Sequence, residues 1–163
     1  MGWVFQNEKK ALIFHLNNTE NQFPLLSFET EGKKYRSISY YPIKLPVEII
    51  EMTAQFGDKV NAKWAAPLED YLIFTEEEAL MKNILGNFVD GSTLANNLAF
   101  KELQDQLASK SSFLWIANTE KLLDLWKKKG LKNKALDDFS SSDYPLVSFQ
   151  GVGEKNFTHL HLR

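Results

Sequence analysis

The N-terminal part of the chain carries the hydrophobic pattern of antiparallel strands. The segment 10–16 alternates with period two, so that every second side chain lies on the same face of an extended chain. The segments 25–29 and 35–41 have a similar β-type composition and flank Glu31-Gly32-Lys33-Lys34. Two such runs joined by a short glycine-containing segment predict a hairpin with its turn at those four residues.

Helical spacing of apolar positions dominates the middle of the chain. Helices are expected to begin at Pro46, at Thr75, at Asn96 or Asn97, and at Asn118 or Thr119, with a short one in 131–139. Glu78, three residues after Thr75, predicts a capping box at the second of these helices. Strands are expected at 60–65, 70–74 and 113–117, and the last is an apolar run typical of a buried strand.

The elements follow one another as strands, then a helix-rich middle, then strands again. Hairpins and short loops favour an antiparallel or mixed sheet with helices packed on one side over an alternating parallel arrangement. The predicted fold class is therefore α+β, with a strand-hairpin unit repeated near both ends of the chain.

That repeat is visible in the sequence itself. The segment Phe23-Pro24-Leu25-Leu26-Ser27-Phe28-Glu29 returns as Tyr144-Pro145-Leu146-Val147-Ser148-Phe149-Gln150, and the match extends to a glycine and a lysine after each copy. Self-similarity of this kind indicates one supersecondary unit used twice. A length of 163 residues suits one domain, or one domain plus a fragment of the next. We therefore expect residues 1–163 to form a single α+β domain, a fragment of a longer protein in which residues 140–163 begin a second repeat.

Composition and charge exclude several classes of protein. An aromatic content of 13% and a hydrophobic content of 44% provide material for a core, which argues against disorder. The formal net charge of −2 gives no indication of a nucleic-acid partner. The absence of cysteine excludes disulfides, thiolate catalysis and Cys-ligated metal sites. No apolar run approaches the ~18 residues that a membrane-spanning helix requires, and the first eight residues lack the pattern of a signal peptide.

The middle of the chain also shows a specific order of features. The strand at 70–74 is followed by Thr75-Glu76-Glu77-Glu78-Ala79-Leu80, the turn Gly91-Ser92-Thr93-Leu94, the pair Asn96-Asn97, a helix led by Phe100, and the strand at 113–117. In this order, residues 70–123 resemble a bacterial envelope domain catalogued as domain of unknown function 3352. The resemblance implies an extracytoplasmic bacterial setting within a larger chain. It brings no catalytic residues, because that family has no established activity.

Histidines and acids provide the candidate metal ligands. His159 and His161 are alternate residues of an expected strand, so both imidazoles lie on one face, a spacing that some zinc sites use. His15, on another expected strand, is a third candidate ligand if the two strands are neighbours. The simpler interpretation is a pair of histidines on a strand without a metal. Glu76-Glu77-Glu78 is a candidate for a cation, but acids in the first turn of a helix also complement its dipole.

Tyrosines near the first predicted hairpin provide a candidate binding surface. Tyr35, Tyr40 and Tyr41 cluster there, and tyrosine is favoured where one end of the side chain is apolar and the other meets water. Ordinary sheet packing accounts for the same residues. The lysine-rich segment 127–134 is better explained as the solvated end of a helix than as a nucleic-acid surface.

No catalytic motif is present in the sequence, and no cofactor is predicted. The favoured hypothesis is a non-enzymatic structural or interaction module of a larger bacterial envelope protein, with a protein or a glycan as partner. One alternative is a metal-binding domain or metal-dependent enzyme that uses His159 and His161. The other is a small-ligand or glycan-binding domain that uses the three tyrosines.

Overall fold

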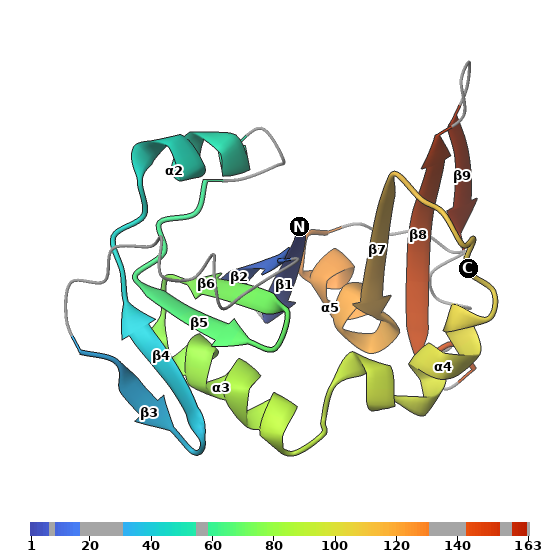
Figure 1. Ribbon diagram of the computed structural model, residues 1–163. Helices are drawn as coiled ribbons and strands as arrows, with labels where there is room; N and C mark the ends of the chain where they lie inside the picture. Colours follow the sequence, from blue (N-terminus) through green and yellow to red (C-terminus); the bar gives the residue numbers. More distant parts are fainter. Residues whose placement is uncertain (7–8, 17–30, 55–58, 131–142, 154–157, 163) are drawn as a thin grey trace. The chain divides into compact units, whose positions relative to one another are not determined.

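The computed structural model describes residues 1–6, 9–16, 31–54, 59–130, 143–153 and 158–162. They belong to two compact units, Met1–Gly91 and Ser92–Arg163 (Figure 1). Each unit has its own antiparallel sheet and its own helices, so the predicted α+β class with helices packed on an antiparallel sheet is confirmed. That the two units form one domain stays a prediction, and the expected start of a second repeat at residue 140 lies outside the described residues.

The first unit is built on a six-stranded sheet. Its strands are β1 (Gly2–Gln6), β2 (Lys9–His15), β3 (Lys33–Tyr35), β4 (Ile38–Pro42), β5 (Trp64–Leu68) and β6 (Tyr71–Thr75). Their order across the sheet is β1-β2-β6-β5-β4-β3, and each neighbouring pair is antiparallel. The pairing of β2 with β6 joins the beginning of this unit to its later part. The sheet therefore depends on contacts between strands that are far apart in the sequence.

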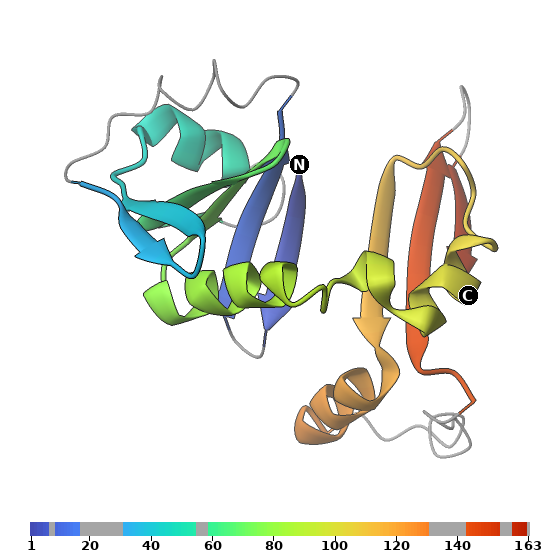
Figure 2. The ribbon, with the colours of Figure 1, turned by 60° about the horizontal axis from the view of Figure 1, so that its bottom comes forward.

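Alternation along the central strands divides the core between the two faces of this sheet. On one face, buried residues of the strands such as Ala11 and Ile73 pack with α3 (Glu78–Val89). The contact is made by buried side chains of the helix that include Leu80 and Met81. Figure 2 shows α3 lying along this side of the sheet. The helix α3 thus covers one face of the sheet.

The opposite face is closed by other parts of the chain. Leu12 and Phe74 point to that side and pack with buried residues of the two segments that flank α2 (Val47–Ala54). The helix itself adds the half-buried Ile49 and Ile50. Because both faces are covered, neighbouring side chains on β2 are almost completely buried on opposite sides of the sheet.

The first hairpin turns at a different place from the one expected. Residues 33–35 form β3 and pair with β4, so the turn lies at Arg36 and Ser37. This pairing places Tyr35 and Tyr40 on the side of α3, where both contribute to the core. Arg36 adopts a φ of 54°. The expected turn at residues 31–34 is therefore wrong, and the expected strand at 25–29 lies outside the described residues.

Two further strands differ from the sequence expectation, while the strands expected at 10–16 and 70–74 are confirmed. β1 was not expected, and it pairs along β2 with Trp3 opposite Leu12. β5 begins at Trp64 instead of residue 60. Val60 and Ala62 are buried in the core that closes the second face, so this apolar stretch packs as a loop before the strand begins.

The start of α3 does not use the predicted capping box. The helix begins at Glu78 with Glu77 as its N-cap residue, and no side chain caps it. Thr75 is the last residue of β6, and its hydroxyl donates to the backbone oxygen of Glu77 (3.0 Å). The sheet therefore holds Thr75 too far before the helix to cap it, and the side chain of Glu78 makes other contacts.

The described residues of the second unit form a three-stranded sheet and two α-helices. β7 (Phe113–Asn118), β8 (Leu146–Gly153) and β9 (Thr158–Leu162) form an antiparallel sheet in that order. The short η2 (Leu94–Asn96) precedes α4 (Leu98–Gln104), which packs beside β8. α5 (Thr119–Lys128) follows β7 directly.

Local signals at the helix ends of this unit are confirmed. Asn97 accepts a hydrogen bond from the backbone N–H of Phe100 (3.1 Å), and Asn118 accepts one from that of Lys121 (3.1 Å). Both are N-cap residues of the expected type. Gly130, with a φ of 72°, follows the end of α5 and has the left-handed conformation that favours glycine there.

The second copy of the internal repeat lies in the three-stranded sheet. Residues 146–150 belong to β8, the central strand. Residues 23–29, the first copy, lie outside the described residues. A shared structure of the two copies therefore stays a prediction.

Candidate functional site

The three histidines lie in two different sheets. His15 is exposed on β2, and its ring meets the ring of Tyr71 edge-on with the centroids 5.3 Å apart. His159 and His161 lie on β9. β2 pairs with β1 and β6, whereas β9 pairs with β8, so the strand of His15 is not a sheet neighbour of β9. Among the side chains that the structure describes, no three His, Asp or Glu residues gather as metal ligands. The side chains of the two β9 histidines are outside that set, and their zinc site stays a prediction.

The three tyrosines do not share one surface. Tyr40 is 1% exposed and belongs to the core beside α3. Tyr35 is half-buried and packs against the same core, where its ring lies next to Gly86 of the helix. Tyr41 is adjacent to Tyr40 on β4 and therefore points to the opposite face. The interpretation of Tyr40 as part of an exposed binding surface is corrected, because its ring is used for sheet packing.

Tyr40 instead anchors a polar cluster at the edge of the core. Its hydroxyl donates to Glu78 Oε1 at 2.7 Å, and the ammonium groups of Lys82 and Lys33 lie 3.1 and 3.2 Å from the same oxygen. Lys33 Nζ also lies 4.5 Å from the centroid of the Trp64 ring, and the centroids of the Trp64 and Tyr40 rings are 5.5 Å apart. One carboxylate oxygen thus connects β3, β4 and α3.

The charges of this cluster set the protonation of its members. The Tyr40 hydroxyl, with Lys82 and Lys33, stabilises the ionised carboxylate and lowers the pKa of Glu78 from 4.5 to about 2. Burial, followed by the neighbouring carboxylate, raises the pKa of Tyr40. Glu78 raises the pKa of Lys82. At neutral pH Glu78 is ionised, and Tyr40 and Lys82 keep their protons. The cluster is therefore suited to holding β4 against α3 and not to proton transfer.

The three consecutive glutamates each meet a lysine from elsewhere in the first unit. Glu77 pairs with Lys9 of β2, Glu76 pairs with Lys63 at 3.6 Å, and Glu78 is held in the cluster just described. A hard cation would require these carboxylates to converge on one point. Because different lysines engage them, the geometry favours the helix-start interpretation of this acidic run over a cation site.

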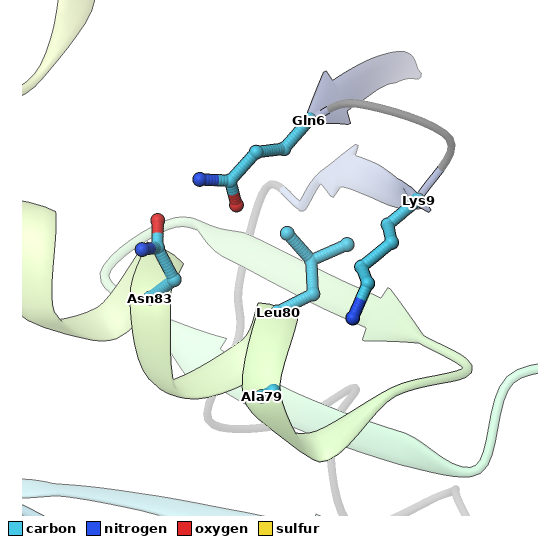
Figure 3. A pocket seen from close by; sticks show the side chains of 5 residues that line it. All are labelled: Gln6, Lys9, Ala79, Leu80 and Asn83. Carbon is cyan, nitrogen blue, oxygen red and sulfur yellow. The ribbon is translucent and has the colours of Figure 1, made fainter.

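A hollow of about 230 Å³ lies beside the first turns of α3. It is lined by Gln6 at the end of β1, Lys9 at the start of β2, and Ala79, Leu80 and Asn83 of the helix (Figure 3). The two amide side chains point toward one another across its mouth. The ammonium group of Lys9 at its rim forms an ion pair with Glu77, the residue before α3. Its volume lies below the range of roughly 300–1,000 Å³ that is typical of small-molecule sites.

The three-stranded sheet has one face composed of apolar side chains. The strand register places Phe113 and Trp115 of β7 on the same side as Phe149 of β8 and Leu160 and Leu162 of β9. Phe113 and Trp115 are 44% and 41% exposed, and Leu160 and Leu162 are 61% and 72% exposed. Together with the smaller Ala117, Val147 and Gly151, these five positions are referred to below as the apolar sheet face.

The opposite face of this sheet is covered only in part, since Leu114 on that side is 43% exposed. Gln150 is 2% exposed, and its side-chain amide bonds both the backbone N–H and the backbone oxygen of Ala108, each at 2.9 Å. Leu103 of α4 is buried as well. α4 and the segment after it therefore lie against the Gln150 side of the sheet, whereas the apolar sheet face carries four large side chains that are each more than 40% exposed.

The strand expected at 113–117 is confirmed, but its expected burial is wrong. Phe113, Leu114 and Trp115 are all more than 40% exposed. An uninterrupted apolar run is typical of a strand that is covered on both faces. β7 lies instead at the edge of a small sheet, and nothing in its own sequence distinguishes this position from a central one.

The remaining sequence candidates contribute no site. The lysines at 127–129 are exposed at the end of α5, as the helix-end interpretation predicts. Across the described ranges, no helix combines the length and the apolar character needed to cross a bilayer. Comparisons with protein-family models, with curated proteins and with solved structures found no match to this chain. The resemblance of residues 70–123 to domain of unknown function 3352 stays a prediction.

Proposed function

We propose that this chain is a non-enzymatic interaction module that presents the apolar sheet face to a protein partner. The observation that carries the proposal is the exposure of Phe113, Trp115, Leu160 and Leu162 on one side of one sheet. Their roughly 400 Å² of exposed side chain has the size of the largest apolar patch on a typical monomer, and such a patch is often functional. A sheet face of this kind is stable when a second layer covers it.

Two further features support this proposal. In the polar cluster around Glu78, the carboxylate is ionised and the Tyr40 hydroxyl keeps its proton, as expected for a structural contact. The resemblance of residues 70–123 supports an extracytoplasmic bacterial setting within a larger envelope protein. In such a chain, a small α+β unit with one uncovered face acts by association with another protein surface.

Dye binding tests the proposal. Anilinonaphthalene sulfonate fluoresces when it binds accessible apolar surface, so the folded chain is expected to bind it. The paired change Leu160→Lys and Leu162→Lys is expected to reduce this fluorescence several-fold. A matched control is the pair Leu94→Lys and Leu98→Lys, which alters exposed leucines of the same unit outside the sheet. Equal fluorescence of both double variants and the unchanged chain would reject the proposal.

A thermal-shift screen against divalent metals, sugars and common cofactors separates the proposal from the metal-binding and glycan-binding alternatives. A ligand that binds only the native state raises the melting temperature by mass action. The interaction module predicts a cooperative transition that none of these compounds moves. A reproducible rise with one compound would replace the proposal with the corresponding alternative.

A further inference from the structure

We infer that the partner of the apolar sheet face is a second copy of this chain, packed face to face about a two-fold axis. This inference rests on the proposed function, since it names the occupant of the same surface. A two-fold contact is formed by one patch that is complementary to itself. Three properties of the patch therefore decide whether two copies can pack on each other: its charge, its area and its shape.

The charge of the face permits this packing. Each of its eight positions is apolar or glycine, and the remaining positions on this side of β8 and β9 are Gly153 and Thr158. Among these positions of the three strands none carries a charge. Two copies can therefore approach without bringing like charges together or burying an unpaired ion. A charged partner would find no complementary group here.

The area of the face is that of a weak contact between two copies. One copy leaves roughly 400 Å² of side chain exposed on this face, so two copies bury at most about 800 Å² plus the rim, which is below the roughly 1,200 Å² of a stable specific interface and in the range of weak, transient contacts. Interfaces of this size are weak. We therefore expect a dimer with a dissociation constant of about 1–100 µM.

The shape of the face permits this packing as well. Trp115 stands beside the small Ala117 on β7, and Leu160 is paired with Gly151, so the surface has both projections and recesses. Two sheets that pack face to face interdigitate such side chains at a spacing of about 10 Å. With α4 already on the other side of the sheet, a second copy completes the layered core that one unit lacks.

Sedimentation equilibrium of the full chain over about 1–100 µM tests the inference within the affinity range expected for a small interface. The weight-average mass of the unchanged chain is expected to rise from one chain toward two. The pair Leu160→Lys and Leu162→Lys is expected to weaken association at least tenfold. The pair Leu94→Lys and Leu98→Lys is expected to associate like the unchanged chain. Far-UV circular dichroism checks that each variant is folded, and Leu162→Lys alone replaces the double variant if that one unfolds.

The outcomes separate this inference from the proposed function. Association that survives the β9 changes, or that the control pair weakens equally, overturns the second-copy inference. A chain that stays monomeric while its dye fluorescence depends on Leu160 and Leu162 also overturns it and leaves the proposed function standing. If the chain is monomeric and the dye fluorescence does not change when Leu160 and Leu162 are replaced, the second-copy inference and the proposed function are both rejected.

A cross-linking experiment gives an independent readout. The chain has no cysteine, so any cross-link with a thiol reagent must form at the single cysteine that is introduced. Leu160→Cys is expected to form covalent dimers with a bismaleimide that spans about 10 Å, the spacing of packed sheets, at least tenfold faster than Leu98→Cys at equal protein concentration. Equal rates at the two positions would contradict the face-to-face arrangement.

Discussion

Replacing Gly151 by alanine is predicted to destabilise the three-stranded sheet through a single aromatic ring. Gly151 lies opposite Phe113 in the register of β7 and β8, and a β-carbon added to it would lie 2.2 Å from Phe113 Cε1. Carbon atoms in ordinary contact are about 3.5–4.0 Å apart, so the ring must move by about 1 Å or more. Because Phe113 is 44% exposed, the ring has room to swing toward solvent.

The size of the effect follows from two opposing contributions. Overpacking costs about 1–3 kcal/mol, and a half-exposed ring lies at the lower end because it moves without displacing backbone. Alanine in place of glycine restricts the unfolded chain and stabilises the fold by about 0.4–1 kcal/mol. The expected net loss is therefore about 0.5–1.5 kcal/mol. If Phe113 is replaced by alanine first, the clash disappears, and Gly151→Ala is expected to be neutral or to stabilise by up to about 1 kcal/mol.

Amide hydrogen exchange in β7 and β8 measures this difference, because it reports the opening free energy of this sheet separately from that of the first unit. The unchanged chain, both single variants and the double variant are compared at low protein concentration, so that self-association does not contribute. We expect a coupling of about 1–2 kcal/mol between the two substitutions. Gly2→Ala is the matched control, since its added β-carbon on β1 meets no atom within 4 Å. Equal effects of Gly151→Ala in both backgrounds, within about 0.5 kcal/mol, would refute the packing argument.

Three further predictions concern the charge cluster, a helix cap and the histidines. Glu78→Gln is expected to lower the urea midpoint at pH 7. The folded-state pKa of about 2 lies below the ordinary 4.5, so the contribution of the carboxylate is present above pH 4.5 and is lost as the pH falls toward 2. Asn118→Ala is expected to destabilise α5 by about 1 kcal/mol, because it removes the bond to the Lys121 N–H. If His159 and His161 bind zinc, zinc is expected to raise the melting temperature, and the double change of both histidines to alanine is expected to abolish that rise.

Each of these predictions has a control and a contradicting result. For Glu78→Gln, the difference from the unchanged chain is followed from pH 7 to pH 2, and a difference that stays constant contradicts the ionised cluster. Asn118→Ser keeps a capping oxygen and is expected to retain most of the stability of α5 in urea denaturation. A loss for serine equal to that for alanine contradicts the cap. A zinc-dependent rise that survives the double histidine change eliminates the metal hypothesis.

Local chemistry in the sequence was sufficient to predict many of the elements. Asn97 and Asn118 cap their helices through hydrogen bonds to residues three positions later, so the information lies within one turn of chain. The alternation at 10–16 predicted β2 because side-chain direction in a strand has a period of two. The α+β class followed from the order of such segments.

The candidate site depended on contacts between distant segments. Tyr40 and Glu78 are 38 positions apart, and only the packing of β4 on α3 brings the phenol to the carboxylate. The same packing explains why Glu78 does not form the capping box that its spacing from Thr75 predicted. The hairpin turn at Arg36 likewise depends on the register that places two tyrosines in the core.

The sequence by itself determined that the segments 10–16 and 70–74 are strands and where the helices α4 and α5 begin, because these features depend on neighbours within a few residues. The tertiary structure alone decided which apolar residues are buried. Phe113 and Trp115 have the same apolar character as the core residues Phe74 and Ile73, yet the first pair is more than 40% exposed and the second pair at most 2%. Burial depends on how many layers pack against a strand. β7 is an edge strand of a small sheet and is exposed on both faces, since Leu114 is 43% exposed as well, whereas β6 is a central strand with a packed layer on each face.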